Sequence, residues 1–304
     1  MELKSITPDV RRGALRALLE KRTFLRFLDI HNALSALIVE HTIVETENGP
    51  QSFDGMWASS LTDATARGMP DIEVVDVASR LGSLGEVMQV TSKPVIYDAD
   101  TGGKAEHFAY TVRKLEWLGV SAAIVEDKTG VKRNSLYGTD VVQSQDTPDN
   151  FARKIAIAKK AQISQDFMLI ARIESFILGK GLDDALMRAE AYLAAGADGI
   201  MIHSREKLPD EVFSFCRKYN RFVDRKPLIV VPSSFNMTTE QALADEGVNI
   251  CIYANQLIRS AYPSMVETAR SILTHSRSAE RDNHMMPIQE ILDLIPTTPF
   301  AETI

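Results

Sequence analysis

The stretch from Ala122 to Leu136 places ionisable side chains of both signs within one short segment. It opens with an apolar run that ends on Glu126 and Asp127, and a loop with three cationic side chains and a glycine follows. Carboxylates at the end of a buried strand suit a hard divalent cation, and such a loop suits an anionic substrate that must be enclosed. The alternative is an acidic strand end followed by a solvated surface loop.

The functional interpretation is favoured because the same pattern recurs along the chain. Other short apolar runs, rich in β-branched residues, also end on polar or charged side chains. The side chains at these ends are Trp57, Ser59, Ser60, Asp98, Asp100, Glu126, Arg172, Glu174, His203, Ser233 and Asn255. They form one site only if the fold brings the ends of the runs together.

Four carboxylates stand out among these polar groups and their neighbours. They are Asp71, Asp98, Asp100 and Glu126. Left unpaired, they would repel one another and raise some of their own pKa values, which a bound cation would prevent. Oxygen ligands without cysteine or paired histidine favour Mg²⁺ over zinc, and because Mg²⁺ keeps several waters, some carboxylates could bind through water. The alternative is that Asp98 and Asp100 cap the following helix and pair with Lys104 or Lys128.

Two further strand ends carry groups that could hold an anion. The Arg172 guanidinium could grip a carboxylate or phosphoryl group, although a structural ion pair with Glu174 is an alternative that could coexist with this role. His203 could donate a hydrogen bond to developing charge, or could simply be a core histidine with its bonds satisfied. Trp57 could form a wall of the pocket or belong to the core.

Eight strand-like runs, each followed by a helical pattern, must position these groups. They cover residues 26–32, 53–61, 93–103, 122–127, 167–175, 198–204, 227–234 and 249–255. Eight successive units predict an α/β fold of the (β/α)8 barrel type, in which all strand ends meet at one rim. An open doubly wound sheet is the alternative, although no GxGxxG follows the first run.

The helical patterns between the runs complete this layout. They include residues 8–20, interpreted as a surface helix before the barrel, 33–44, 71–90 with Asp71 at its start, and C-terminal helices within 256–304. We expect one barrel domain over residues 1–304, with residues 1–24 as an N-terminal helical extension.

Composition limits the partners and the location. The chain of 304 residues has 34 Lys plus Arg against 41 Asp plus Glu, a net charge of -7, which argues against nucleic acid as the main partner. Neither Cys216 nor Cys251 belongs to a CxxC motif or a disulfide framework, which favours packed thiols in a reducing compartment. No run approaches the roughly 18 apolar residues of a membrane span. We expect a cytoplasmic protein without a membrane anchor.

Taken in order, the motifs resemble those of a known family. The segments DGMWASSL, YDADTGG, VEDKTGVKRNSL, IARIES, GIMIHS, VVPSS and IYAN are similar to the phosphoenolpyruvate mutases of the isocitrate lyase superfamily, over nearly the whole chain beyond the first twenty or so residues. DAD is shared across the superfamily, whereas EDKxxxKxNSL is specific to the mutase branch. The resemblance implies a barrel, a homotetramer and C-terminal helices that exchange between subunits.

The resemblance also implies roles for residues of this chain. Mg²⁺ would bind at Asp98, with Asp71, Asp100 and Glu126 holding its waters. The substrate would sit on the Ser59–Ser60 turn beside Trp57, and its phosphoryl group would meet Arg172, His203 and Asn134. Residues 128–136 would close over it, and the implied catalytic and binding residues are Asp71, Lys132, Asn134, Arg172 and His203, with Trp57, Ser59, Ser60, Ser135 and Leu136.

The implied reaction interconverts phosphoenolpyruvate and phosphonopyruvate, the first step of phosphonate biosynthesis. Mg²⁺ would stabilise the pyruvate enolate, and the transferred phosphoryl must meet the enolate before water does, which requires a closing loop. One departure is Gly102-Gly103-Lys104 where many relatives carry Gly-Tyr-Gly after DADT.

Three rival functions remain. Lyases of the superfamily carry KKCGH in the gating loop, and this chain has Lys132-Arg133-Asn134-Ser135 instead, without a thiol. Phosphonopyruvate hydrolase is closer, and it tends to carry threonine where this chain has Asn134. A catalytically silent metal-binding barrel is the third rival, and it is disfavoured by the carboxylates, Arg172 and the loop.

Overall fold

The computed structural model describes residues 3–47 and 49–295, and its centre is a closed barrel of eight parallel strands. The strands are β1 (Leu25–Ile30), β4 (Gly55–Ala58), β5 (Val95–Asp98), β6 (Ala122–Glu126), β9 (Met168–Ile173), β10 (Gly199–Ile202), β11 (Leu228–Val230) and β12 (Ile250–Tyr253). The barrel closes because β1 pairs in parallel with both β12 and β4. The predicted barrel is therefore confirmed, each predicted run forms one of its strands, and the open-sheet alternative is wrong.

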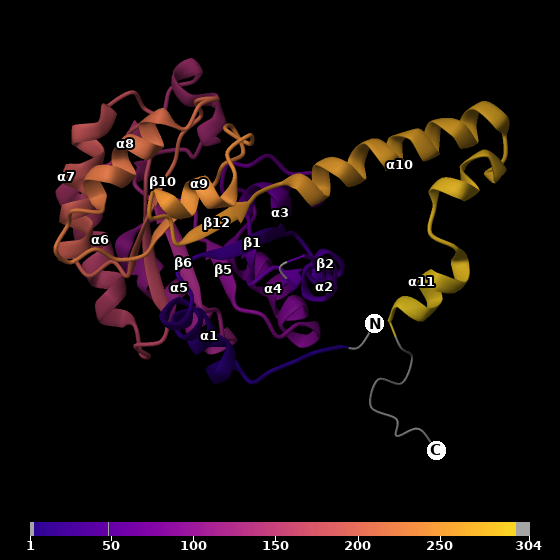
Figure 1. The fold of residues 1–304 in the computed structure, drawn as a ribbon, viewed down its shortest axis with the longest axis horizontal. Coiled ribbons are helices and arrows are strands. Elements are labelled where there is room, and N and C mark those ends of the chain that lie inside the picture. The colour runs from indigo at the N-terminus through magenta and orange to yellow at the C-terminus, as the bar shows by residue number, and fades with distance from the viewer. Residues whose placement is uncertain (1–2, 48, 296–304) are drawn as a thin grey trace.

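Helices follow the strands and surround the barrel (Figure 1). They are α2 (Ala33–His41), α3 (Ser60–Ala66), α4 (Val77–Val90), α5 (Ala105–Leu118), α6 (Pro148–Ala161), α7 (Gly181–Ala194), α8 (Asp210–Tyr219) and α9 (Glu240–Asp245). Local sequence fixes several ends. Asn32 and Ser35 form a capping box on α2, Thr147 caps α6, and Gly119 ends α5 in the left-handed conformation.

The interior of the barrel is packed with aliphatic side chains, the Trp57 side chain and the aromatic ring of Phe27. Gly55 on the neighbouring strand makes room for that ring, since a Cβ there would lie 2.2 Å from it. Helix α1 (Pro8–Lys21) covers the N-terminal end of the barrel, where its Leu15 is fully buried against the interior cluster. The expectation of a surface helix is therefore wrong in part, because one face of α1 completes the core. Residues 1–2 of the predicted extension lie outside the described residues.

Two predicted helices have different bounds in the structure. Helix α2 ends at His41, and a hairpin of β2 (Ile43–Thr46) and β3 (Gly49–Ser52) follows. Helix α4 begins at Val77, so Asp71 lies in a non-helical segment. The reason is that Asp76 caps α4 through the Ser79 amide, while Glu73, at φ 61°, accepts hydrogen bonds from Thr101. These contacts hold the segment beside the strand ends.

The gating loop also has local structure that the sequence did not predict. Strands β7 (Lys128–Thr129) and β8 (Ser144–Gln145) pair as a short hairpin, and between them lies the 3-10 helix η1 (Ser135–Asp140). The hairpin pairs the start of the loop with residues 144 and 145, and so closes the base of the longer segment that contains the loop. The expectation that both cysteines are packed thiols is confirmed, since Cys216 and Cys251 are buried and form no disulfide.

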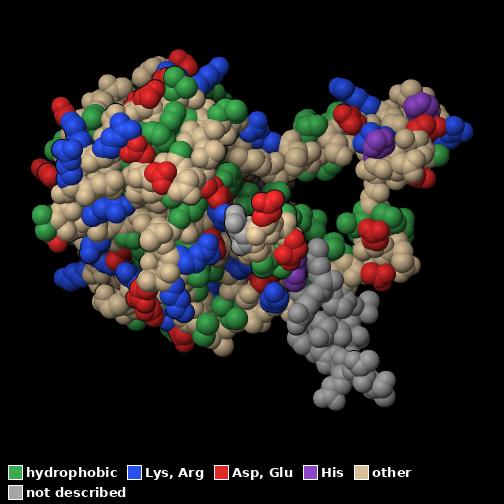
Figure 2. Space-filling view, in the orientation of Figure 1, with side chains coloured by type: hydrophobic (Ala, Val, Ile, Leu, Met, Phe, Trp, Pro, Cys, Tyr) green, Lys and Arg blue, Asp and Glu red, His purple; other side chains and the backbone are tan. Residues whose placement is uncertain are grey.

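The C-terminal helices form an arm that extends away from the barrel (Figure 1). The arm consists of α10 (Gln256–His275), the 3-10 helix η2 (Ala279–His284) and α11 (Ile288–Leu294). None of the residues in these three elements is buried, and Figure 2 shows apolar side chains exposed along the arm. Residues 296–304 of the predicted C-terminal helices lie outside the described residues. No described helix is both long enough and apolar enough to cross a membrane.

Candidate active site

A small polar pocket lies where the C-terminal ends of the barrel strands meet, and its volume is about 70 Å³. Its lining contains Trp57, Ser59, Ser60, Asp71, Asp98, Glu126, Lys132, Asn134, Ser135, Leu136, Arg172 and His203. Ser233 and Asn255, two further predicted strand-end residues, also belong to the lining. Two predicted residues do not: Asp100, which contacts Lys132, and Glu174, which pairs with Arg172. The barrel thus gathers into one place side chains that are more than a hundred residues apart in sequence.

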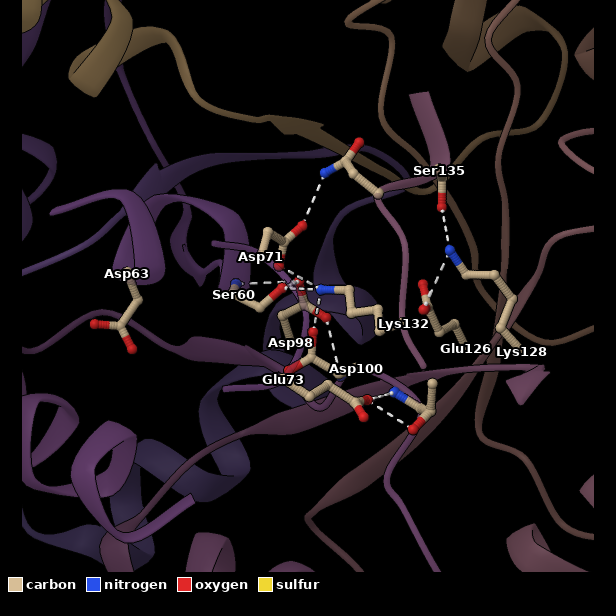
Figure 3. Close-up of polar contacts among 12 residues, drawn as sticks. Ser60, Asp63, Asp71, Glu73, Asp98, Asp100, Glu126, Lys128, Lys132 and Ser135 are labelled. Carbon is tan, nitrogen blue, oxygen red and sulfur yellow. Dashed lines mark hydrogen bonds and ion pairs between the residues drawn. The ribbon is translucent and has the colours of Figure 1, made fainter. Parts of the chain in front are cut away.

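The Lys132 ammonium lies at the centre of the predicted carboxylate cluster (Figure 3). Its Nζ donates to Asp71 Oδ1 at 2.7 Å, to Ser60 Oγ at 2.7 Å, and to Asp100 at short range. Burial lowers the pKa of Lys132, but the surrounding carboxylates outweigh burial and raise it above the ordinary lysine value. Lys132 therefore stays charged and neutralises carboxylates that would otherwise repel one another.

Asp98 and Asp100 are held in different ways, and their pKa values move in opposite directions. Asp98 Oδ2 accepts a hydrogen bond from Ser60 Oγ at 2.9 Å. Burial raises the pKa of both groups. For Asp98, the charges of Lys132, Arg172 and Arg80 outweigh burial, and its pKa lies below the ordinary aspartate value. For Asp100, burial and the adjacent Asp98 charge leave the pKa raised. Asp100 also has the left-handed φ of 53°.

Arg80 on α4 contacts both Asp98 and Asp100, and it is not among the predicted site residues. Its Nη1 donates to Asp100 Oδ2 at 2.9 Å and to the Asp98 carbonyl at 2.7 Å, and its guanidinium stacks on the Tyr97 ring. A signal was present, because Arg80 lies one helical turn before Leu84 on the buried face of α4. A charged residue on the apolar face of a helix indicates a buried partner.

A second cluster lies on the opposite wall, around Glu174. The Arg172 side chain pairs with Glu174 at short range and donates to Ser135 Oγ at 2.7 Å. Burial raises the pKa of Glu174, but Arg172 and Lys128 outweigh it and hold that pKa well below the ordinary value. The ion pair between Arg172 and Glu174 that the sequence left as an alternative is thus present, and Arg172 lines the pocket as well.

His203 is a neutral hydrogen-bond donor in this arrangement. Burial, reinforced by the adjacent Arg172 charge, lowers the pKa of His203. Its Nδ1 lies 2.8 Å from Arg172 Nη2 and 3.3 Å from Glu174. Since the shorter contact is to a group that only donates, Nδ1 accepts and the ring proton is on Nε2.

Glu126 is the least satisfied carboxylate of the site. Burial raises its pKa to about 7. Lys128 Nζ lies 3.3 Å from Glu126 Oε1, yet this oxygen has no hydrogen-bond partner within the described part of the chain. A buried oxygen in this situation fits a bound cation or an ion-bound water.

The loop of residues 128–136, called the lid below, is folded over the pocket. Asn134 Nδ2 donates to Asp71 Oδ2 at 2.8 Å, while its Oδ1 accepts from the Leu136 amide at 3.0 Å. Lys128 Nζ donates to the Arg133 carbonyl at 2.7 Å and to Ser135 Oγ at 2.9 Å. The lid is therefore closed, with the Asn134 amide held at the pocket wall.

Asp29, at the end of β1, is a second buried group that the sequence analysis missed. Its Oδ1 accepts from Thr62 Oγ1 at 2.9 Å, and burial raises its pKa to about 7. The run that contains it, LRFLDI, reads as an ordinary apolar strand with one acidic residue. The signal was again a charge within an otherwise buried pattern.

Comparison with known proteins places this site in a family. The family model described as phosphoenolpyruvate phosphomutase matches residues 15–273, most of the chain. The chain belongs to the phosphoenolpyruvate phosphomutase family. The resemblance inferred from the sequence motifs is thereby confirmed at the level of the family.

The relatives that are similar to this chain include both phosphoenolpyruvate phosphomutases and a phosphonopyruvate hydrolase. The phosphoenolpyruvate phosphomutase of Tetrahymena pyriformis is 33% identical over 294 residues, which is 96% of this chain and 94% of the relative. The phosphonopyruvate hydrolase of Variovorax sp. (strain Pal2) is 35% identical over 283 residues, which is 92% of this chain and 93% of the relative. Sequence identity alone does not separate the two activities.

Solved structures support the same family and fold. The phosphoenolpyruvate phosphomutase from Streptomyces platensis subsp. rosaceus superimposes with a TM-score of 0.84 at 34% identity, covering 93% of this chain and 94% of the other. A phosphonopyruvate hydrolase in complex with oxalate and Mg²⁺ gives a TM-score of 0.81 at 32% identity, covering 94% of each chain. A divalent ion is therefore part of at least one similar member of the superfamily.

The donor set of this phosphomutase family member suits such an ion by its chemistry. Its carboxylates supply only oxygen, and the buried Glu126 Oε1 lacks a hydrogen-bond partner. Among residues 3–47 and 49–295, no three acidic, histidine or cysteine side chains are arranged to hold an ion directly.

Proposed function

We propose that the protein interconverts phosphoenolpyruvate and 3-phosphonopyruvate by intramolecular phosphoryl transfer, as the first step of phosphonate biosynthesis. The observation that carries this proposal is the Asn134 side chain, which the closed lid holds in the lining of the pocket that Arg172 and His203 also line. Three donors thus line the pocket that a phosphoryl group would occupy. Such an arrangement suits the loose transition state of phosphoryl transfer. Catalysis there depends on fixed donors that position and stabilise the phosphoryl oxygens, rather than on covalent bonds to the protein.

Each donor has a defined proton to offer. Arg172 stays charged beside Glu174, neutral His203 offers Nε2–H, and Asn134 offers its amide. The pyruvyl carboxylate is proposed to lie on the Ser59–Ser60 turn beside Trp57. In this pose the phosphoryl group can leave one end of the enolate and rejoin at the other without leaving the three donors.

Mg²⁺ is the proposed cofactor. Asp98 would hold it, with Asp71, Asp100 and Glu126 binding its waters, and when bound it would supply Lewis-acid stabilisation of the enolate oxygen. Lys132, which now lies between these carboxylates, is proposed to keep its charge while its contacts shift toward the substrate. Arg80 would keep Asp100 in place during that exchange.

Exclusion of water is the chemical requirement that separates this reaction from hydrolysis. Trp57, Leu136, Met201 and Val231 are apolar side chains in the lining, and the space between them has room for only a few water molecules. The hydrolase is the second candidate because a hydrolase is as similar to this chain as a mutase is. The presence of Asn134, where the hydrolase tends to carry threonine, favours the mutase.

Phosphorus NMR with phosphonopyruvate and Mg²⁺ tests the proposal. A mutase gives phosphoenolpyruvate, and a hydrolase gives pyruvate and inorganic phosphate in a one-to-one ratio. Orthophosphate as the main product would replace the mutase by the hydrolase. A protein that changes neither the phosphonate nor phosphoenolpyruvate would instead be a lyase of another substrate or a silent barrel.

We also propose that the protein acts as a cytoplasmic homotetramer in which arms exchange between subunits. Support comes from the arm itself, whose apolar residues Leu273, Ile288 and Leu292 are 83%, 76% and 63% exposed. Side chains of this kind on an extended helix need a covering surface. A second copy of the chain would supply one.

A further inference from the structure

The lid is held from outside the pocket as well as from inside it. Arg205 lies in the connection from β10 to α8, two residues after His203. Its Nη1 donates to the Tyr137 carbonyl at 3.1 Å and lies 2.9 Å from Asp140 Oδ2. Its Nη2 lies 3.4 Å from Thr139 Oγ1. One guanidinium therefore contacts three residues of η1, Tyr137, Thr139 and Asp140, which come directly after the lid.

Gly138 shows how closely Arg205 approaches this segment. The residue has φ 52° and ψ -130°, a conformation that glycine adopts far more readily than other residues. A Cβ at this position would lie 2.4 Å from Arg205 Cζ, well inside van der Waals contact. The guanidinium thus packs directly on the glycine backbone, and the backbone bends to allow it.

The inner and outer contacts of the lid differ in what they depend on. Inside the pocket, Lys132 and Asn134 bind Asp71, a group that the proposed reaction uses for the ion and its waters. These contacts must change when substrate and ion enter. The Arg205 side chain is 32% exposed and reaches η1 from outside, so its contacts do not depend on what fills the pocket.

We propose that Arg205 is a positioning residue that keeps the lid shut while the pocket contents change, and so sets the partition between isomerisation and hydrolysis. This inference rests on the proposed function. In either outcome the carbon–phosphorus bond of phosphonopyruvate breaks and an enolate forms. In isomerisation the enolate oxygen takes the phosphoryl group. In hydrolysis a water oxygen takes it and loses a proton, while the enolate carbon gains a proton to give pyruvate.

The Arg205→Met variant tests this partition. Phosphorus NMR is expected to show the ratio of orthophosphate to phosphoenolpyruvate rising about fivefold, the change expected from losing partly exposed polar contacts. Arg205→Lys keeps the positive charge near Asp140 but loses the several N–H donors of the guanidinium. Its product ratio should lie between those of the wild type and Arg205→Met. Lys207→Met removes the same charge from an exposed position of the same connection, and should leave the ratio unchanged.

Limited trypsin digestion provides a readout that does not depend on activity. Arg133 is exposed on the lid, but a protease needs the segment to open before it can cut the next peptide bond. Without substrate or metal, mass spectrometry should show this bond cut about fivefold faster in Arg205→Met than in the wild type or Lys207→Met. Equal cleavage rates would overturn the role of Arg205.

The two tests separate the possible failures. If the wild type makes only pyruvate and orthophosphate, the proposed isomerase fails, and the digestion still decides whether Arg205 holds the lid. If the wild type makes phosphoenolpyruvate but Arg205→Met keeps the wild-type product ratio, the isomerase stands and the inference about Arg205 is wrong.

Discussion

Individual residues in the pocket act through the state of their protons. Burial alone would leave several carboxylates protonated, yet Asp98 and Glu174 are ionised because Lys132 and Arg172 lie against them. Burial, reinforced by the Arg172 charge, lowers the pKa of His203 and favours its neutral form. The pocket therefore combines fixed positive charge with neutral donors, which suits an anionic substrate whose charge moves during the reaction.

Asn134 is expected to decide the reaction. In Asn134→Ala, the amide donor is lost, and turnover of phosphonopyruvate to phosphoenolpyruvate should fall by about 10²-fold or more, as for loss of other transition-state donors. In Asn134→Thr, a shorter hydroxyl replaces the amide, and we expect orthophosphate to become a larger share of the product. Both are measured by phosphorus NMR, with the exposed Asn150→Ala on α6 as the control. Full activity in Asn134→Ala would remove this assignment.

Asp29 is expected to make stability depend on pH. Its folded pKa of about 7 lies above the ordinary aspartate value of 3.8, so folding favours the protonated form. The stabilisation is complete below the unfolded pKa and is lost as pH rises through the folded pKa, by up to about 4 kcal/mol. Urea unfolding should show the wild type losing stability between about pH 4 and 7, and Asp29→Asn losing less. Parallel pH profiles for the two proteins would contradict the assignment.

Among the elements, α4 has a part in the site that its sequence position does not suggest. It begins late, after the segment that carries Asp71, and it directs Arg80 from its buried face toward the end of β5. This contact links a helix on the outside of the barrel to two carboxylates inside the rim. The lid is positioned similarly, by the β7–β8 hairpin at its base and by Arg205 beyond its end.

Replacement of Arg80 tests the contribution of α4. Arg80→Met keeps an apolar side chain on the helix face but leaves Asp100 without one of its two cations. We expect the free energy of unfolding to fall by about 3 kcal/mol, as when one partner of a buried pair is removed. The Mg²⁺ concentration needed for half-maximal activity should rise as well. The measurements are urea denaturation and a Mg²⁺ titration of activity.

Arg67→Met provides a matched control for that experiment. Arg67 and Arg80 both pair with Asp63, at 2.8 Å and 3.4 Å. The Arg67 side chain differs in being 33% exposed, and Arg67 has no contact with the residues that line the pocket. Its loss should cost less than about 1 kcal/mol and leave the Mg²⁺ dependence unchanged. Equal effects of the two substitutions would mean that Arg80 has no special role.

At the scale of the whole molecule, the barrel and the arm differ in how well they are covered. The barrel buries its interior cluster beneath α1, whereas the residues of α10, η2 and α11 are all at least partly exposed. Figure 2 shows this arm separated from the body of the protein along much of its length. The division into one barrel domain with terminal extensions stays a prediction, which a single cooperative unfolding transition would support.

The arm is expected to mediate assembly. Light scattering of the wild type should give the mass of four chains, because the apolar side chains of α11 would pack on neighbouring subunits. Ile291→Glu combined with Leu292→Glu should lower that mass. Trp117→Glu changes an apolar side chain that is 77% exposed on α5, and should leave the mass unchanged. A monomer mass for the wild type would mean that the arm packs on its own barrel.

The sequence by itself determined the barrel, the order of its strands and most of the residues at its rim. Strands buried on both faces have a short, apolar, β-branched pattern that local sequence shows, and a closed barrel brings all their ends together without further information. Asp98, Glu126, Arg172 and His203 could be found for that reason.

Only the tertiary structure decided which of these groups meet and which distant side chains hold them. The ammonium of Lys132 among the carboxylates, Arg80 behind Asp100, and Arg205 on Gly138 are contacts between segments that are 20 to 72 positions apart. Nothing in a local pattern encodes such a pair, because its energy depends on how deeply both partners are buried and on the distance between them. The late start of α4 has the same cause. Glu73 contacts Thr101, just after β5, and Asp71 contacts Lys132 in the lid, and a longer helix would remove both contacts.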